Sequence, residues 1–310
     1  MAVRGKHSPS KDPSFKSMKA DYYPVQRSVN LGTGAVVGQN LVLDVARNLS
    51  VVNHRLYRQG KTYQVKIDLE NRSADAVPSQ YEIYALVDTW YVQKAWQLAR
   101  AAYLRSTADE RGVMSKQKIA RWEDFRVTSG ITGAIDVVPY RYSSGLAGAV
   151  DTDGEFDNSE ITLADGTTQK SFTWGAGGAS QFGILNEYDE SGNTDLAPST
   201  ADSDNPYEGT DPGVHESQMD DLATRGNAPP YNATDFNTSI WVKVATLDNS
   251  SSTNPGVAGG HSRMSTGFFN APCGFVVIKQ SLANESLTGQ LTMTVKAGDY
   301  KGVSAMNMGV

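Results

Sequence analysis

The chain has 310 residues, a formal net charge of −6 and a single cysteine, Cys273, which excludes an internal disulfide framework and a cysteine-rich metal site. No apolar run approaches the roughly 18 residues of a membrane-spanning helix. The N-terminal stretch lacks the apolar segment of a secretory signal, so we expect a chain made in a reducing compartment.

The charge is distributed unevenly along the chain. Residues 1–30 hold six Lys/Arg against two Asp, and residues 31–150 hold 15 Lys/Arg against 11 Asp/Glu. Residues 151–225 hold 17 Asp/Glu against two basic residues, a net charge of −15. This asymmetry indicates two faces that meet different partners.

Residues 1–30 are predicted to form a flexible, mildly basic arm, because they are rich in Ser, Lys and Pro and show no apolar periodicity before Tyr22. Basic side chains in such an arm provide salt-dependent contacts to nucleic-acid phosphates. The residues predicted to make these contacts are Arg4, Lys6, Lys11, Lys16, Lys19 and Arg27. The alternative is a solubilising tail.

Residues 31–57 are predicted to hold one or two strands, since Leu41, Leu43 and Val45 alternate with more polar positions. Residues 60–62 read Gly-Lys-Thr, as at the end of a phosphate-binding loop. That loop needs a glycine five positions earlier, where this chain has Arg55. We therefore predict a hairpin turn at residues 58–62.

The strongest pattern lies in residues 61–112. Residues 62–69 alternate strictly between apolar and polar side chains, and residues 81–87 begin in the same way, which predicts two strands. Asp88 and Thr89 then suit a helix N-terminus, and apolar residues recur at helical spacing from Val92 to Tyr103. One long amphipathic helix over residues 89–111 is predicted to lie across the end of a sheet.

Residues 135–142 predict a further strand, whose end Pro139 would place at a sheet edge. Before it, residues 115–125 fit a short helix or a passage from helix to strand. Residues 143–237 are mostly Asp, Gly, Ser, Thr, Asn and Pro, with short apolar runs at 161–163, 171–174 and 182–185. A segment of this length without strong elements predicts a long acidic surface insertion.

Strand patterns return at residues 239–245, 274–279 and 289–296. Core strands at both ends of the chain imply that the first and last thirds pair with one another. We therefore predict an all-β sandwich of residues 31–310 with an insertion at about 143–237. A tandem pair of β-domains is the structural alternative, although no internal repeat is visible.

Four carboxylates surround a glycine near the start of the acidic segment: Asp151, Asp153, Glu155 and Asp157. Calcium favours flexible loops of oxygen ligands, but the spacing is not that of an EF-hand loop. Calcium is therefore one interpretation and a solvated acidic turn is the other. No other cofactor is expected.

No motif in the chain dictates a reaction. The four histidines are scattered, and Cys273 reads as a small residue at the entrance to a strand. A hydrolase assembled from remote loops is a third class of function, but we expect no enzyme. The five tryptophans could form a ligand platform, although Trp96 and Trp241 lie at predicted core positions.

The layout resembles that of the jelly-roll coat proteins of small icosahedral viruses and phages. The resemblance is carried by residues 61–105, 272–279 and 289–296, together with the arm and the long polar excursion. It implies a jelly-roll β-sandwich, or a tandem double jelly roll, that forms the capsid shell. In that family the arm faces the packaged genome and the loops project outward; the arm of this chain is less basic than most.

The expected function is thus a structural capsid subunit of a virion, made in a host cell and self-assembling in many copies around the genome. Its expected partners are further copies of the chain, viral nucleic acid at the arm, and a host receptor at the acidic loops. The alternative is a calcium-dependent carbohydrate-binding β-sandwich module.

Overall fold

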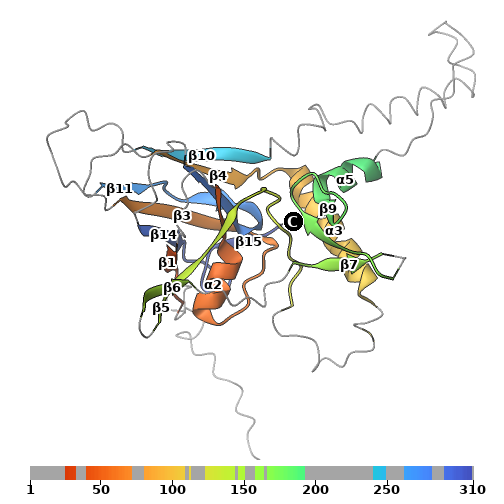
Figure 1. Cartoon of the computed structure of the whole chain (residues 1–310), viewed down its shortest axis with the longest axis horizontal. Coiled ribbons are helices and arrows are strands. Elements are labelled where there is room, and N and C mark those ends of the chain that lie inside the picture. The colour runs from red at the N-terminus through yellow and green to blue at the C-terminus, as the bar shows by residue number, and fades with distance from the viewer. Residues whose placement is uncertain are drawn as a thin grey trace, which may run out of the picture.

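The computed structural model describes residues 25–32, 40–71, 80–108, 112, 123–143, 146–150, 158–163, 166–192, 240–248, 262–280 and 290–308. Most of the described elements are strands of one large mixed sheet that curls so that its two halves face each other (Figure 1). The predicted all-β sandwich is confirmed.

The first half of the sheet has the antiparallel strand order β1-β14-β3-β11. These strands are β1 (Ser28–Gly32), β14 (Gln290–Val295), β3 (Lys61–Asn71) and β11 (Ser262–Ser265). Two short strands, β12 (Phe269–Ala271) and β15 (Ala305–Asn307), also pair with the first part of β3. The last described strand of the chain therefore lies beside Lys61, Thr62 and Tyr63.

The second half has the antiparallel order β10-β4-β13-β2. These strands are β10 (Trp241–Asp248), β4 (Gln80–Leu86), β13 (Phe275–Gln280) and β2 (Asn40–Asp44), with the 3-10 turn η3 (Pro272–Gly274) before β13.

A single strand, β5 (Ile135–Ser143), joins the two halves. It runs parallel to β2 and antiparallel to β1, and its end pairs with β6 (Leu146–Val150). Pro139 lies opposite Leu31 of β1, inside the sheet. The prediction of a sheet edge at Pro139 is therefore wrong, because β5 passes from one partner strand to the next at this point.

The main core lies between the two halves. Alternate residues of β2, β3, β4, β13 and β14 point into it, in keeping with the period of two seen in the sequence. Fully buried members include Leu43, Val65, Ile67, Ile83 and Met293.

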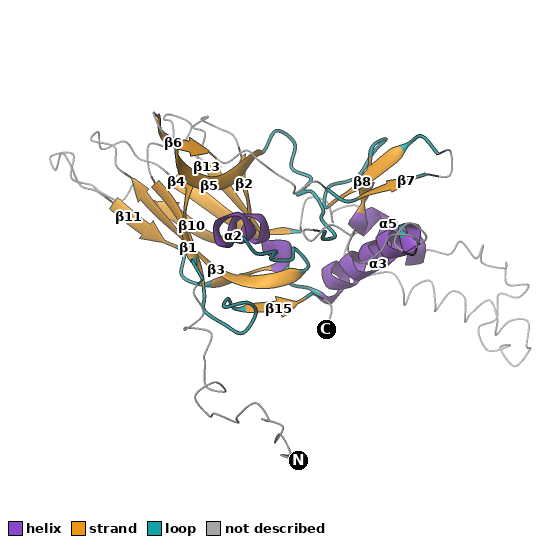
Figure 2. Cartoon of the chain, turned by 90° about the horizontal axis from the view of Figure 1, so that it is seen from below, coloured by secondary structure: helices purple, strands orange, loops and turns teal. Residues whose placement is uncertain are grey.

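A second core covers the outer face of the half that contains β13. Ile278 and Val276 of β13 face the main core, whereas Val277 faces the second one, so both faces of this strand are buried. The covering elements are α3 (Trp90–Ser106), α5 (Ile184–Gly192) and a small sheet of β7 (Glu160–Thr162), β8 (Gln169–Thr173) and β9 (Gln181–Gly183). Figure 2 shows α3, α5, β7 and β8 together on one side of the sandwich.

Part of the segment predicted as a surface insertion therefore belongs to the core. Phe172, Trp174, Ile184 and Leu185 are buried against α3 and the outer face of the sheet. Their sequence pattern is weak because each element is short and contributes only one or two apolar side chains. Residues 151–157 and 193–239 lie outside the described residues.

Two predictions near the N-terminus are wrong, one about the type of an element and one about the end of the arm. The second of the strands expected in residues 31–57 is the helix α2 (Val45–Asn53), which begins where Asp44 accepts a hydrogen bond from the backbone N–H of Arg47. Residues 25–30, assigned to the flexible arm, are described here, and β1 buries Val29 against β14.

Candidate functional site

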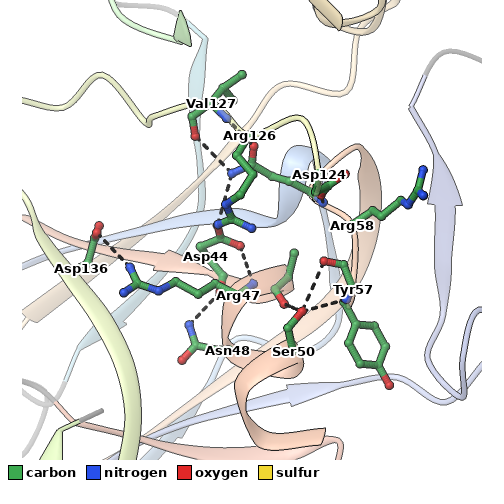
Figure 3. Close-up of polar contacts among 12 residues, drawn as sticks. Asp44, Arg47, Asn48, Ser50, Tyr57, Arg58, Asp124, Arg126, Val127 and Asp136 are labelled. Atoms are coloured by element: carbon green, nitrogen blue, oxygen red, sulfur yellow. Dashed lines mark hydrogen bonds and ion pairs between the residues drawn. The ribbon is translucent and has the colours of Figure 1, made fainter. Parts of the chain in front are cut away.

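A buried ion pair fixes the connection from α2 to β3. The guanidinium of Arg126 contacts the carboxylate of Asp44, and these side chains are only 6% and 12% exposed (Figure 3). Gln59 joins the same network, because its Nε2 donates to Asp44 Oδ2 at 3.2 Å and its Oε1 accepts the N–H of Val127 at 2.7 Å. The loop that leads into β3 is thereby held in one position.

A pocket of about 510 Å³ opens beside this loop, between the start of β3, one side of α3 and the last described residues of the chain. The lining side chains that carry its chemistry are Arg58, Lys61, Trp96, Arg100, Asp124 and Asn307. A smaller hollow of about 90 Å³ shares Arg58, Arg100 and Asp124 with it and reaches Glu123.

Close packing between Gly60 and Trp96 shapes the pocket. A Cβ atom on Gly60 would lie 2.1 Å from Cη2 of the Trp96 ring, so any larger residue would have to displace the indole. The carbonyl of Gly60 also accepts the N–H of Met308 at 3.2 Å, which fixes the C-terminal segment at the pocket wall. Residues 58–60 connect α2 to β3, so the predicted hairpin turn at 58–62 is wrong.

Positive charge gathers at the mouth of the pocket. Nζ of Lys61 donates to Oδ1 of Asn307 at 2.5 Å and lies 3.9 Å from the centre of the Tyr300 ring. Burial lowers the pKa of Lys61, and the positive charges of Arg58 and Lys301 lower it further. On α3, the Arg100 guanidinium lies 5.8 Å from the centre of the Trp96 ring.

The carboxyl group that lines the same pocket belongs to Asp124. Its Oδ2 accepts the backbone N–H of Gln59 at 2.8 Å. Burial raises the pKa of Asp124, although this hydrogen bond and the charges of Arg126 and Arg58 oppose the shift. Arg58 and Asp124 lie at the edge of the buried network in Figure 3.

The residues predicted to contact nucleic acid are not brought together here. Arg4, Lys6, Lys11, Lys16 and Lys19 lie outside the described residues. Arg27 is part of the folded body, where its Nε donates to the carbonyl of Gly302 at 2.7 Å. It is therefore not an arm residue, because β1 starts directly after it.

The predicted calcium ligands Asp151, Asp153, Glu155 and Asp157 also lie outside the described residues. Across the ranges that the structure describes, no three His, Cys, Asp or Glu side chains converge as a metal site. No helix in those ranges is both long enough and apolar enough to cross a membrane.

The four tryptophans in the described part of the chain do not gather into one exposed surface, and Trp122 lies outside that part. Trp96 and Trp174 are buried in the second core, Trp241 is half-buried against it, and Trp90 is 68% exposed at the start of α3. The predicted core position of Trp96 is confirmed. Cys273 is buried just before β13, and burial raises the pKa of its thiol well above the usual range.

Sequence reasoning missed the pocket because its cations come from two distant stretches of the chain, residues 58–61 and α3. Lys61 belongs to the Gly-Lys-Thr triplet that was interpreted as a turn, and Arg100 lies on the polar side of the predicted helix. The signal that was present is the density of Arg and Lys between residues 55 and 61.

No family model, curated protein or solved structure matches the chain.

Proposed function

We propose that the chain is a non-catalytic structural subunit of a virus capsid, with a jelly-roll body that self-assembles into an icosahedral shell around the genome. The observation that carries the proposal is the order of the principal strands. If β1, β2, β3, β4, β10, β11, β13 and β14 are numbered 1 to 8, the two halves have the orders 1-8-3-6 and 5-4-7-2. Sequential strands thus alternate between the facing sheets, except for strands 4 and 5, which pair within one sheet, as in the two Greek keys of a jelly roll.

The long excursion fits a shell tile. Between β4 and β10 only β5 and β6 pair within the main sheet, and the other described elements of this stretch, α3, α5 and the small sheet, lie against the outer face of the β10-β4-β13-β2 half. A body enlarged on one side in this way gives a subunit more lateral surface without altering the eight-strand frame. Connections between elements vary more than the elements themselves and often carry binding surfaces.

Exposed apolar side chains provide contact surfaces for other copies. Trp90 and Leu98 on α3 are 68% and 40% exposed, and Val242 and Val244 on β10 are 48% and 37% exposed. Single exposed apolar residues are ordinary, but here they recur on two elements. In a shell, many copies of a modest interface add up to a stable assembly.

The proposed partners follow from the charge distribution. In this proposal the five Lys/Arg of residues 1–24, against two Asp, contact the enclosed nucleic acid, and the acidic side chains of the segment 151–225, with its net charge of −15, contact a host receptor. The virion is then the place where the protein acts.

Negative-stain microscopy and light scattering of the purified full-length chain, over a range of salt and protein concentrations, test this proposal. Closed particles of uniform size are the expected result. A chain that remains a monomer under every condition contradicts it. A calcium-dependent rise in melting temperature together with binding to a glycan array would instead favour the carbohydrate-binding module.

A further inference from the structure

The pocket between β3 and α3 carries more positive than negative charge. Among the described residues that line it, Arg58, Lys61 and Arg100 are basic and Asp124 carries the one carboxyl group. The ion pairs found among the described residues join other side chains and include none of these three cations. Their positive charges are therefore available to an anion that enters the pocket.

The described contacts of Lys61 and Asp124 compensate little of this charge. The hydrogen bond from Lys61 goes to the neutral side chain of Asn307, and the pKa of Lys61 is lowered by burial and then by Arg58. Burial also raises the pKa of Asp124, so its negative charge is less favoured than that of an exposed carboxylate. A bound anion would relieve the repulsion among the cations.

The residue types favour phosphate over other anions. Arginine presents a planar fork of N–H donors that matches phosphate oxygens, and lysine provides a compact charge beside it. The pocket, at about 510 Å³, lies within the usual range for small-molecule sites, so it has room for a phosphate with its attached sugar.

We propose that the pocket formed by Arg58, Lys61 and Arg100 binds a phosphate group carried by a nucleotide or by single-stranded nucleic acid. Arg58 and Arg100 donate to the phosphate oxygens from opposite walls, and Lys61 contributes its charge at the mouth. This binding site does not depend on shell formation, and it places a nucleic-acid contact in the folded body in addition to the arm.

The experiment measures binding of dTMP by calorimetry and of fluorescently labelled dT12 by anisotropy to the full-length protein. The double variant Arg58→Gln/Arg100→Gln is compared with Lys94→Gln, which removes one cation from the exposed side of α3. We expect the double variant to lose about tenfold or more in affinity for dTMP, and Lys94→Gln to bind like the wild type. For dT12, the plot of log K against log salt has a negative slope. Its magnitude should be smaller by about 1.4 in the double variant, which removes two cations at about 0.7 each.

The two ligands distinguish a free nucleotide from a polynucleotide as the source of the phosphate, and they also show whether the proposal fails. Loss of dTMP binding with dT12 binding unchanged indicates that the pocket takes a free nucleotide; loss of dT12 binding, with or without loss of dTMP binding, indicates that it takes the polynucleotide. Unchanged binding of both ligands, or displacement of dTMP by poly-glutamate at equal charge, overturns the proposal.

If the double variant does not fold, Arg100→Gln alone carries the test, with Arg100→Lys as the variant that retains the charge. Particle formation is recorded separately, so that failure of the shell proposal and failure of the pocket proposal are distinguishable.

Discussion

Arg126 and Asp44 form a buried ion pair that joins the segment before β5 to the first residue before α2. The same carboxylate caps α2 through the N–H of Arg47. One side chain therefore sets both the start of a helix and the position of a loop 82 residues away in sequence. Because the pair is almost completely excluded from water, each charge depends on the other for its compensation.

Replacement of Arg126 by methionine is expected to lower the free energy of unfolding by about 3 to 5 kcal/mol, because it leaves the Asp44 carboxylate buried without a countercharge. The matched control is Arg47→Met, which breaks the ion pair with Asp136, whose side chain is 69% exposed. Arg47 itself is 19% exposed, but the exposed carboxylate at the other end keeps the contribution of this pair below about 1 kcal/mol. Urea unfolding measures both, and equal losses in the two variants would contradict the assigned role of burial.

Gly60→Ala is expected to destabilise the protein by about 1 to 3 kcal/mol, because the added methyl group overlaps the Trp96 ring. It should also weaken dTMP binding, since Trp96 forms part of the pocket wall. Gly112→Ala is the control, because a Cβ at Gly112 meets no atom within 4 Å. Thermal melting of the two variants checks the prediction; a Gly60→Ala protein as stable as the wild type would show that the indole moves freely.

The elements that the sequence predicted well are those with a long, unbroken period. The alternation across residues 62–69 became β3, and the helical spacing after Thr89 became α3, which ends at Ser106 and not at residue 111. Both have one face against a core and one face against water or polar neighbours. This difference between the two faces is the physical cause of the periodicity in the sequence.

The helix α2 was missed because its first apolar residue, Val45, continues the alternation of β2. The distinguishing feature was Asp44, whose side chain caps the helix and ends the strand. The pocket was beyond prediction for a different reason. Arg58 and Arg100 line one pocket because α3 packs beside the start of β3, and no local pattern encodes this tertiary arrangement.

Trp174→Ala is expected to lower the free energy of unfolding by about 3 to 5 kcal/mol, because this fully buried ring lies in the second core. Trp90→Ala, at an exposed position, should change stability by less than about 0.5 kcal/mol. Denaturant unfolding of both variants measures the difference. A Trp174→Ala protein with native stability would mean that the small sheet is an appendage, as the sequence had predicted for this segment.

Asp124 should make the free energy of unfolding depend on pH in the direction opposite to that of most carboxylates. Burial raises its folded-state pKa above the ordinary value of 3.8, so the folded protein binds the proton more tightly than the unfolded chain. The contribution of Asp124 to stability therefore falls as the pH rises from 3.8 through its folded pKa. In Asp124→Asn this loss is absent, and the variant should gain stability relative to the wild type as the pH rises.

Glu82 supplies the contrast for the same measurement. Hydrogen bonds from Lys243 and then Tyr84 lower the pKa of Glu82 below its ordinary value of 4.5. Its stabilising contribution is present above 4.5 and is lost as the pH falls through the folded pKa. Glu82→Gln should thus lose stability relative to the wild type as the pH rises. Urea unfolding at several acidic pH values would refute the assignments if both variants shifted in the same direction.

The double variant Trp90→Gln/Leu98→Gln tests whether the exposed side of α3 holds copies together. Both side chains protrude from the folded subunit, so their replacement should leave the melting temperature unchanged. If this face is an interface, the variant removes apolar area from every contact in a shell, and the loss is multiplied over many contacts. We expect the yield of particles in negative stain to fall at least severalfold, while Lys296→Gln, an exposed polar position after β14, assembles normally. Normal particles from the α3 variant would show that the contact between copies does not involve this side of α3. The exposed Val242 and Val244 of β10 would then be tested next.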